Sequence, residues 1–268
     1  MINRPPHYMP GAEPIFHRGS SDIGCLLLHG ITASPAELSW LAQDLAARDF
    51  TVYVPRMAGH GSDYRLLRGV GWRDWYLTGA DGLHLLRAQC RRVVVIGHSM
   101  GGLVGSLLAA NAPVDGLILL AAPFSLPKTE PSLRAARWLQ LVRPFLYLGD
   151  TSNLPMTIRQ EQLRRGEPYR GRVRYERWAT RALHELYLLM VQARRALPQI
   201  TTPTLLMYSE ADETVPFFNQ NYAAGKIGSK QVELAVLKTS SHILPQDVER
   251  ETVFEMIAEF IERLKTMG

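Results

Sequence analysis

A serine lies at the centre of the pentapeptide Gly97-His98-Ser99-Met100-Gly101, which fits the pattern G-x-S-x-G. This pattern forms a sharp turn between a strand and a helix, and the turn exposes the serine hydroxyl for nucleophilic attack. The preceding run 92–96 is rich in β-branched residues, as in a buried strand, and apolar residues at helical spacing follow the motif. We therefore interpret Ser99 as a catalytic nucleophile.

A serine hydroxyl needs a base to take its proton and an acid to orient that base. On this strand–turn–helix arrangement the acid precedes the histidine along the chain. An expected strand at 203–208 runs into a loop with three candidate acids, Glu210, Asp212 and Glu213. We favour Asp212, whose short side chain at the loop apex can point back at a histidine. His242 follows the next expected strand and is the only histidine after Asp212, so we predict that it is the base.

The other histidines have ordinary interpretations. His29, at the end of the first core strand, is predicted to be structural, and His60, between two glycines, to hold a loop by hydrogen bonds. His98 is expected to point away from the nucleophile on the tight turn. The remaining histidines are interpreted as surface or packing residues: His7, His17, His84 and His184. No pair has the His-x-x-x-His spacing of a zinc site. Because a serine nucleophile with a histidine base needs neither a metal nor a cofactor, we expect none.

Acyl transfer passes through an intermediate with a negatively charged oxygen, which main-chain N–H groups can stabilise. One donor is predicted to be Met100, directly after the nucleophile, and the other to come from the loop after an early strand. That strand includes residues 25–28 and the loop is 29–33. Ile31 is therefore the second candidate donor. The alternative interpretation of Gly30-Ile31 is a plain strand-to-helix turn.

Strands and helices alternate along the chain, which predicts an α/β fold whose mostly parallel central sheet has helices on both faces. In the first helix we expect Ser34 as the N-cap, Pro35 at the first position and Glu37 completing a capping box. The last helix has an apolar stripe at helical period. Strands are expected near 24–29, 51–54, 92–97, 116–121, 203–208 and 232–237.

Residues 124–200 interrupt this alternation without a good strand. We predict a small helical cap (lid) insertion there, over the active site, and a core domain made of 1–123 and 201–268. Bulky Trp138, Phe145 and Tyr187 predict a bounded pocket for short-to-medium acyl chains. Two apolar faces are expected on the cap, namely Trp138, Leu139, Leu141, Val142, Phe145 and Leu146, and Leu183, Leu186, Tyr187 and Met190.

The predicted cap is basic, with fourteen Lys and Arg against six Asp and Glu, whereas the whole chain has a net charge of +5. A solvated outer face is the ordinary interpretation. Peripheral contact with anionic lipid surfaces, or attraction of acidic substrates, is the alternative. The basic and aromatic stretch 169–178 could suggest nucleic acid, but we expect no nucleic-acid partner because no nucleic-acid module is present.

Length and composition are those expected of a soluble globular protein. The chain has 268 residues, of which 46% are hydrophobic and 21% charged, enough for one α/β domain with an insertion. Residues 1–20 contain no apolar run of signal-peptide length, and no segment approaches the length of a membrane span. The two cysteines, Cys25 and Cys90, are expected to be buried free thiols. We therefore expect a cytoplasmic protein, a monomer or a homodimer.

The segments that carry these residues resemble the α/β-hydrolase superfamily, and within it the small bacterial carboxylesterases and monoacylglycerol lipases. The resemblance implies Ser99 as nucleophile, Asp212 as acid, His242 as base, and an oxyanion hole made by the N–H groups of Ile31 and Met100. Many members of the subgroup have an aromatic residue at the position of Ile31 and a leucine at the position of His98. The matching segments are 26–32, 58–61, 72–75, 97–102, 211–216 and 240–242.

The sequence thus predicts a serine hydrolase that cleaves carboxylic esters of short-to-medium acyl chains, with monoacylglycerols among the candidates. A nucleophilic serine argues against the dehalogenases and epoxide hydrolases of this fold, which use aspartate. Thioesterases, C–C bond hydrolases, lactonases and perhydrolases can share the triad and form the alternative. A non-catalytic small-molecule receptor on the same fold is a second alternative, since fold alone does not decide function.

Overall fold

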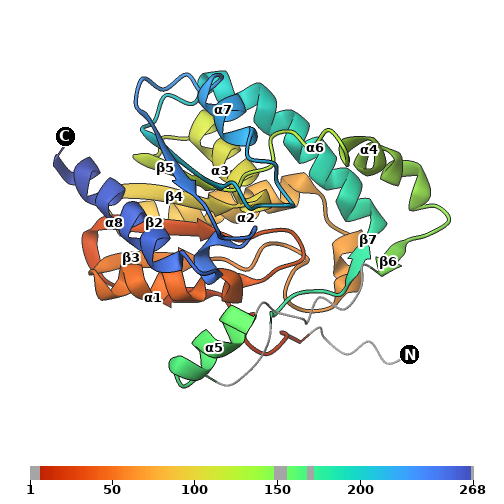
Figure 1. Cartoon of the computed structure of the whole chain (residues 1–268), viewed down its shortest axis with the longest axis horizontal. Helices are drawn as coiled ribbons and strands as arrows, with labels where there is room; N and C mark the ends of the chain where they lie inside the picture. Colours follow the sequence, from red (N-terminus) through yellow and green to blue (C-terminus); the bar gives the residue numbers. More distant parts are fainter. Residues whose placement is uncertain (1–6, 148–155, 168–171, 267–268) are drawn as a thin grey trace.

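A seven-stranded sheet forms the centre of the molecule (Figure 1). The computed structural model describes residues 7–147, 156–167 and 172–266. Every neighbouring pair in the order β1-β3-β2-β4-β5-β8-β9 is parallel except β1 with β3. All six strands expected from the sequence belong to this sheet, which confirms the mostly parallel α/β fold. The strands are β1 (Ile15–His17), β2 (Ser20–Leu28), β3 (Phe50–Val54), β4 (Arg92–His98), β5 (Gly116–Leu120), β8 (Thr204–Ser209) and β9 (Val232–Leu237).

Helices cover both faces of the sheet, and each face has its own hydrophobic core. The helices that take part are α1 (Ser39–Ala47), α2 (Trp72–Arg87), α3 (Met100–Asn111), α6 (Thr180–Ala196), α7 (Asn219–Ala224) and α8 (Arg250–Thr266), with 3-10 turns at Pro35–Leu38, Tyr64–Arg68 and Leu244–Gln246. Val93 and Val95 of β4 join the core under α2, α3 and α6, whereas Val94 and Ile96 join the core under α1 and α8. Because both of its faces are buried, β4 is apolar over most of its length.

The segment 124–200, predicted to be a helical cap, contains both helices and a two-stranded sheet. Helix α4 (Glu130–Leu139) packs against α6, which in turn packs on α3. The strands β6 (Phe145–Tyr147) and β7 (Arg177–Ala179) pair antiparallel, and the 3-10 turn Leu197–Gln199 ends the segment. The expectation of no strand here is therefore wrong. Strands of three residues carry too few alternating positions to be recognised in a sequence.

The remaining helix of this segment, α5 (Met156–Arg164), lies apart from α4 and α6, close to α1 (Figure 1). Its Glu161 is buried and forms an ion pair of 2.7 Å with Arg250 of α8. Trp40 of α1 donates a hydrogen bond of 3.0 Å from Nε1 to Glu167. The segment therefore contacts more than one side of the core. Residues 169–171, the start of the basic stretch noted in the sequence, lie outside the described residues.

Several apolar residues of this segment face solvent. Trp138 is 64% exposed, Leu141 75% and Val142 78%. The apolar face predicted around Trp138 is therefore largely exposed, because the buried positions of α4 are Leu133 and Ala136. Trp138 instead lines an outer groove between α4 and α6 together with Tyr187. A bounded acyl pocket therefore finds no support from Trp138.

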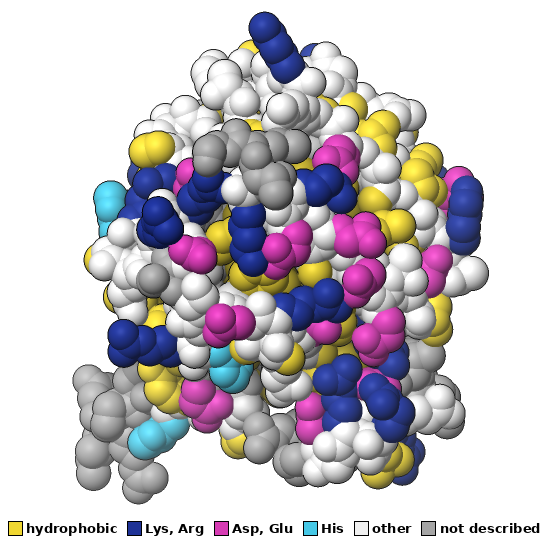
Figure 2. Space-filling model, turned by 90° about the vertical axis from the view of Figure 1, so that its left-hand side faces the viewer, with side chains coloured by type: hydrophobic (Ala, Val, Ile, Leu, Met, Phe, Trp, Pro, Cys, Tyr) yellow, Lys and Arg dark blue, Asp and Glu magenta, His cyan; other side chains and the backbone are white. Residues whose placement is uncertain are grey.

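The surface on the side of α8 carries interspersed basic and acidic side chains (Figure 2). Ion pairs tie some of them together: Arg48 of α1 lies 2.6 Å from Glu255 of α8, and Arg263 of α8 lies 2.5 Å from Glu233 of β9. Such exposed pairs contribute about 0–1 kcal/mol each to stability. None of the helices in the described ranges combines the length and the apolar character that crossing a bilayer requires.

Candidate active site

The predicted nucleophile Ser99 lies on the turn between β4 and α3. Its φ of 53° is in the left-handed region that side chains other than glycine rarely adopt. Close packing holds this turn: a Cβ on Gly97 would lie 2.3 Å from the Gly101 carbonyl oxygen, and one on Gly101 would lie 2.0 Å from the Leu28 carbonyl oxygen. Only glycine fits at these two positions, so the helix approaches the sheet closely and the serine stands out from the turn.

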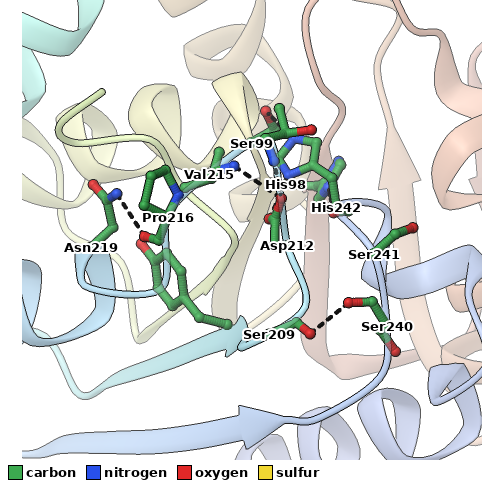
Figure 3. A network of polar contacts seen from close by, with 12 residues as sticks. His98, Ser99, Ser209, Asp212, Val215, Pro216, Asn219, Ser240, Ser241 and His242 are labelled. Atoms are coloured by element: carbon green, nitrogen blue, oxygen red, sulfur yellow. Dashed lines mark hydrogen bonds and ion pairs between the residues drawn. The ribbon is translucent and has the colours of Figure 1, made fainter. Parts of the chain in front are cut away.

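The other two predicted residues meet Ser99 in a continuous chain of contacts (Figure 3). His242 Nε2 lies 3.0 Å from Ser99 Oγ, and His242 Nδ1 lies 2.8 Å from Asp212 Oδ2. An ionised carboxylate only accepts, so Nδ1 of neutral His242 carries the proton and donates to Asp212. The lone pair on Nε2 then faces the serine hydroxyl, as proton removal requires. The structure thus brings together three residues that lie up to 143 positions apart in the chain.

The loop after β8 fixes the acid. Asp212 Oδ1 accepts hydrogen bonds from the main-chain N–H groups of Thr214 and Val215, at 2.8 and 2.9 Å. The two competing acids point elsewhere. Glu210 is 47% exposed and pairs with Lys238, and Glu213 is exposed. Asp212 alone of the three reaches His242 in the described structure.

The loop after β9 fixes the base through two carboxylates. Asp247 Oδ2 accepts a hydrogen bond of 2.8 Å from the main-chain N–H of Ser241, next to His242. Glu249 Oε2 accepts one of 2.7 Å from the N–H of Ser240. Ser209, at the end of β8, donates from Oγ to the Ser240 carbonyl at 2.5 Å, which joins this loop to the loop of the acid (Figure 3). These hydrogen bonds to the main chain of Ser240 and Ser241 hold the loop that carries His242.

The protonation states suit an acid–base pair. Burial acts to raise the pKa of Asp212, but hydrogen bonds from His242, Val215 and Thr214 hold it below its usual value. Burial lowers the pKa of His242, although the Asp212 carboxylate opposes this effect. At neutral pH the carboxyl group is therefore ionised and the imidazole neutral, ready to accept a proton.

The two candidate oxyanion donors lie at the start of α3 and in the turn after β2. Met100 is the first residue of α3, where main-chain N–H groups have no partner within the helix. Ile31 lies in the turn after β2. That turn is held at both ends, because Gly30 donates from its N–H to Glu37 Oε1 at 3.0 Å and the Thr32 carbonyl accepts from the N–H of Tyr175 at 2.9 Å.

Two buried residues near the site were not assigned to it from the sequence. Glu37 was expected to cap the first helix, and this expectation is wrong: the Ser34 side chain makes no capping bond and donates to the Val173 carbonyl instead. The Glu37 carboxylate turns inward to His98, with 2.8 Å between Oε1 and Nδ1. His98 Nε2 lies 2.9 Å from the His242 carbonyl oxygen. The one feature of the sequence that could have pointed to this contact is His98 itself, because many members of the subgroup that the chain resembles have leucine at that position.

The interpretations of His29 and His60 are confirmed. His29 donates from Nδ1 to the Gly30 carbonyl at 2.9 Å and accepts from the Met57 N–H at Nε2, at 3.2 Å. His60 donates from Nδ1 to the Ala58 carbonyl at 3.0 Å. Burial lowers the pKa of His29 to about 4 and that of His60 to about 3, so both hold their loops as neutral rings.

A cavity of about 350 Å³ lies beside the turns that follow β2, and its lining includes Glu37, Trp40, Arg172 and Arg174. Ser99 and His242 are not among its lining residues. Within the described ranges, no group of three His, Cys, Asp or Glu side chains is placed to hold a metal ion. The contacts among Ser99, His242 and Asp212 are of the kind that activates a hydroxyl for nucleophilic attack.

Known proteins of similar sequence and fold include a lipase and an esterase. A thermostable monoacylglycerol lipase of Bacillus sp. (strain H-257) is 28% identical over 260 residues, covering 95% of this chain and 96% of the relative. A carboxylesterase of Bacillus subtilis (strain 168) is 24% identical over 253 residues, covering 94% and 97%. A solved structure from work on LipS and LipT, two metagenome-derived lipolytic enzymes, superimposes with a TM-score of 0.85 at 26% identity, covering 96% of this chain and 100% of the other.

The family match extends over most of the chain. Residues 20–249 match the family Hydrolase_4, described as serine aminopeptidase, S33. The matched range begins with β2 and includes Ser99, Asp212 and His242. The chain therefore belongs to the Hydrolase_4 (S33) family of α/β-hydrolases.

Proposed function

We propose that this protein is a serine hydrolase of carboxylic esters with short-to-medium acyl chains, including monoacylglycerols. The observation that carries the proposal is the contact chain from Asp212 through His242 to Ser99, with hydrogen-bonding distances of 2.8 and 3.0 Å. Such a chain activates a hydroxyl that is otherwise a poor nucleophile. The names of the relatives, a monoacylglycerol lipase and a carboxylesterase, support esters as the substrate class.

The proposed reaction has two halves. His242 takes the proton of Ser99 as Oγ attacks the ester carbonyl, and the oxyanion that forms accepts hydrogen bonds from the N–H groups of Ile31 and Met100. The tetrahedral intermediate collapses, and His242 gives its proton to the leaving alcohol. Water, deprotonated by the same histidine, then cleaves the acyl-enzyme. Asp212 holds the imidazole in the required tautomer and stabilises its charged form.

The substrate range is tested with p-nitrophenyl esters from C2 to C16 and with 1-monoacylglycerols. We expect the best kcat/KM at short-to-medium acyl length and a value at least about tenfold lower at C16, because each unaccommodated methylene loses binding energy in the transition state. Fatty acid release from medium-chain monoacylglycerols should be measurable by titration. Equal or faster turnover of long-chain triglycerides would contradict the proposal.

The same assay separates the alternatives. Acyl thioesters, lactones and a β-diketone substrate for C–C cleavage are offered at matched acyl length. A kcat/KM for any of these above that of every ester would assign the triad to that reaction instead. A folded protein that binds esters but turns none over would be the receptor on this fold.

We also propose that the segment 124–200 touches lipid surfaces. Trp138, Leu141 and Val142 are exposed beside the exposed cations Arg137 and Arg143. Apolar side chains can enter the boundary between headgroups and acyl chains while nearby arginines meet anionic headgroups. An amphiphilic substrate such as a monoacylglycerol resides at such a boundary.

Co-sedimentation with vesicles measures this contact. We expect binding to phosphatidylglycerol vesicles, weaker binding to phosphatidylcholine vesicles, and loss of most binding in the double variant Trp138→Ser, Val142→Ser. The matched control is Leu234→Ser on β9, where an apolar side chain is 49% exposed. Equal binding of the double variant and the control to phosphatidylglycerol vesicles would contradict this proposal.

Location and assembly stay predictions. The cytoplasmic location expected from the sequence is consistent with Cys25 and Cys90, which are free and buried. Size-exclusion chromatography distinguishes the monomer from the homodimer.

A further inference from the structure

His98, the residue directly before Ser99, is buried between two acceptors. Its Nδ1 lies 2.8 Å from Glu37 Oε1, and its Nε2 lies 2.9 Å from the main-chain carbonyl oxygen of His242. A carbonyl oxygen has no proton to give. Nε2 must therefore be a donor.

The Glu37 carboxylate also has no proton to give. Its Oε1 accepts a second hydrogen bond from the Gly30 N–H at 3.0 Å, and its Oε2 lies 3.4 Å from the Arg172 guanidinium. Two donors, one of them a guanidinium cation, thus already face this carboxylate and favour its ionised form, so we infer that Nδ1 of His98 donates as well. With a proton on both nitrogens, the ring is an imidazolium.

We propose that His98 is a positioning residue: as a buried imidazolium it ties the Glu37 carboxylate, behind the oxyanion turn, to the main chain of the base His242. One end of this bridge holds Gly30, next to the candidate donor Ile31. The other end holds the histidine whose ring must face Ser99. The bridge thus connects the turn of the candidate oxyanion donor Ile31 with the loop of the candidate base His242. This positioning role rests on the function proposed above.

The charges around the bridge are paired. Glu37, on the 3-10 turn after β2, faces His98 from β4 and Arg172 from the segment before β7. Arg174 of that segment, His29 at the end of β2 and Asp212 after β8 also act on this cluster.

Burial acts to lower the pKa of His98, but Glu37 and the His242 carbonyl raise it above its usual value. Glu37 is held well below its usual pKa by His98 and Arg172, although burial opposes them.

The imidazolium also affects the base directly. The ring centroids of His98 and His242 are 5.0 Å apart. A cation at this distance disfavours a second cation, so His98 helps to lower the pKa of His242. Removing the positive charge of His98 takes away a repulsion that lowers the pKa of His242. It also leaves the negative charge of Glu37 unneutralised, which raises the pKa of His242 further. The acid limb of the pH–rate profile should then move to higher pH.

The protonation state is tested without reference to activity. In the wild-type chain labelled with ¹⁵N-histidine, we expect one histidine at pH 7 whose two ring nitrogens both carry slowly exchanging protons. The variant His98→Gln should remove this pair of signals. A single ring N–H for His98 at pH 7 would overturn the proposal.

The positioning role is tested by pH profiles of kcat and kcat/KM on the best ester. His98→Leu removes both the charge and the donor to His242, and His98→Gln removes the charge but keeps an amide N–H that can donate. We expect both variants to shift the acid limb upward by about one pH unit. We expect His98→Leu to lose about tenfold to a hundredfold in plateau kcat through misplacement of His242, and His98→Gln to recover part of this loss.

His84→Gln, on the exposed face of α2, is the control and should keep the wild-type profile. A wild-type acid limb in both His98 variants would refute the role assigned to His98 and leave the proposed function intact. If instead Ser99→Ala kept full activity, the proposed function would fail, while the ¹⁵N spectrum would still decide whether His98 is an imidazolium.

Discussion

Replacing Ser99 by alanine should lower kcat/KM for every ester that the protein cleaves by about 10⁵–10⁶-fold. The change removes the atom that forms the acyl-enzyme, and His242 then has no hydroxyl to deprotonate. What remains is the contribution of binding and of the oxyanion donors, about 10³–10⁴-fold over water. Steady-state kinetics on a p-nitrophenyl ester measures the loss, with enzyme concentration raised to keep the residual rate visible.

A second serine offers a matched control. Ser106 lies on the same helix α3, is fully buried and donates from Oγ to the Gly102 carbonyl at 2.8 Å. Ser106→Ala should keep the wild-type kcat, and its free energy of unfolding should fall by about 1 kcal/mol for the lost hydrogen bond. A fluorophosphonate should label the wild-type chain once and Ser106→Ala equally, but not Ser99→Ala. More than about 1% of the wild-type kcat/KM in Ser99→Ala would reject the nucleophile assignment.

The residues of the candidate triad could be predicted because local features determine them. The strand before Ser99 and the helix after it are recognisable from a few residues, and Gly97 and Gly101 are required by the close approach of α3 to the sheet. His242 has no competitor after Asp212 in the sequence. Choosing Asp212 over Glu210 needed only the expectation that a short side chain at the loop apex points inward.

Features that depend on distant contacts could not be predicted in the same way. Glu37 has the spacing of a capping box, which contributes about 1 kcal/mol, but its carboxylate contacts His98, 61 positions away in the chain. The helical period of residues near Trp138 shows that they share a face. It does not show whether that face meets the core or the solvent. The short strands β6 and β7 exist only because the chain brings them together.

Asp212→Asn should lower kcat by about 10⁴-fold with little change in fold. In the wild type, Asp212 Oδ1 accepts two main-chain hydrogen bonds, from Thr214 and Val215. The carbonyl oxygen of an asparagine must take this place, since an amide NH₂ cannot accept. Its NH₂ group then faces His242 Nδ1 and donates to it. The imidazole proton is forced onto Nε2, which can no longer accept the proton of Ser99.

The competing acid supplies the control for this prediction. Glu210→Gln removes an equal charge from the same loop, at a side chain that pairs with Lys238 and is 47% exposed. It should keep kcat within about twofold, since exposed pairs contribute about 0–1 kcal/mol. If Glu210→Gln lost activity and Asp212→Asn kept it, the acid would have to be reassigned. If both kept it, His242 would act without a carboxylate partner, and the tautomer argument for its orientation would fail.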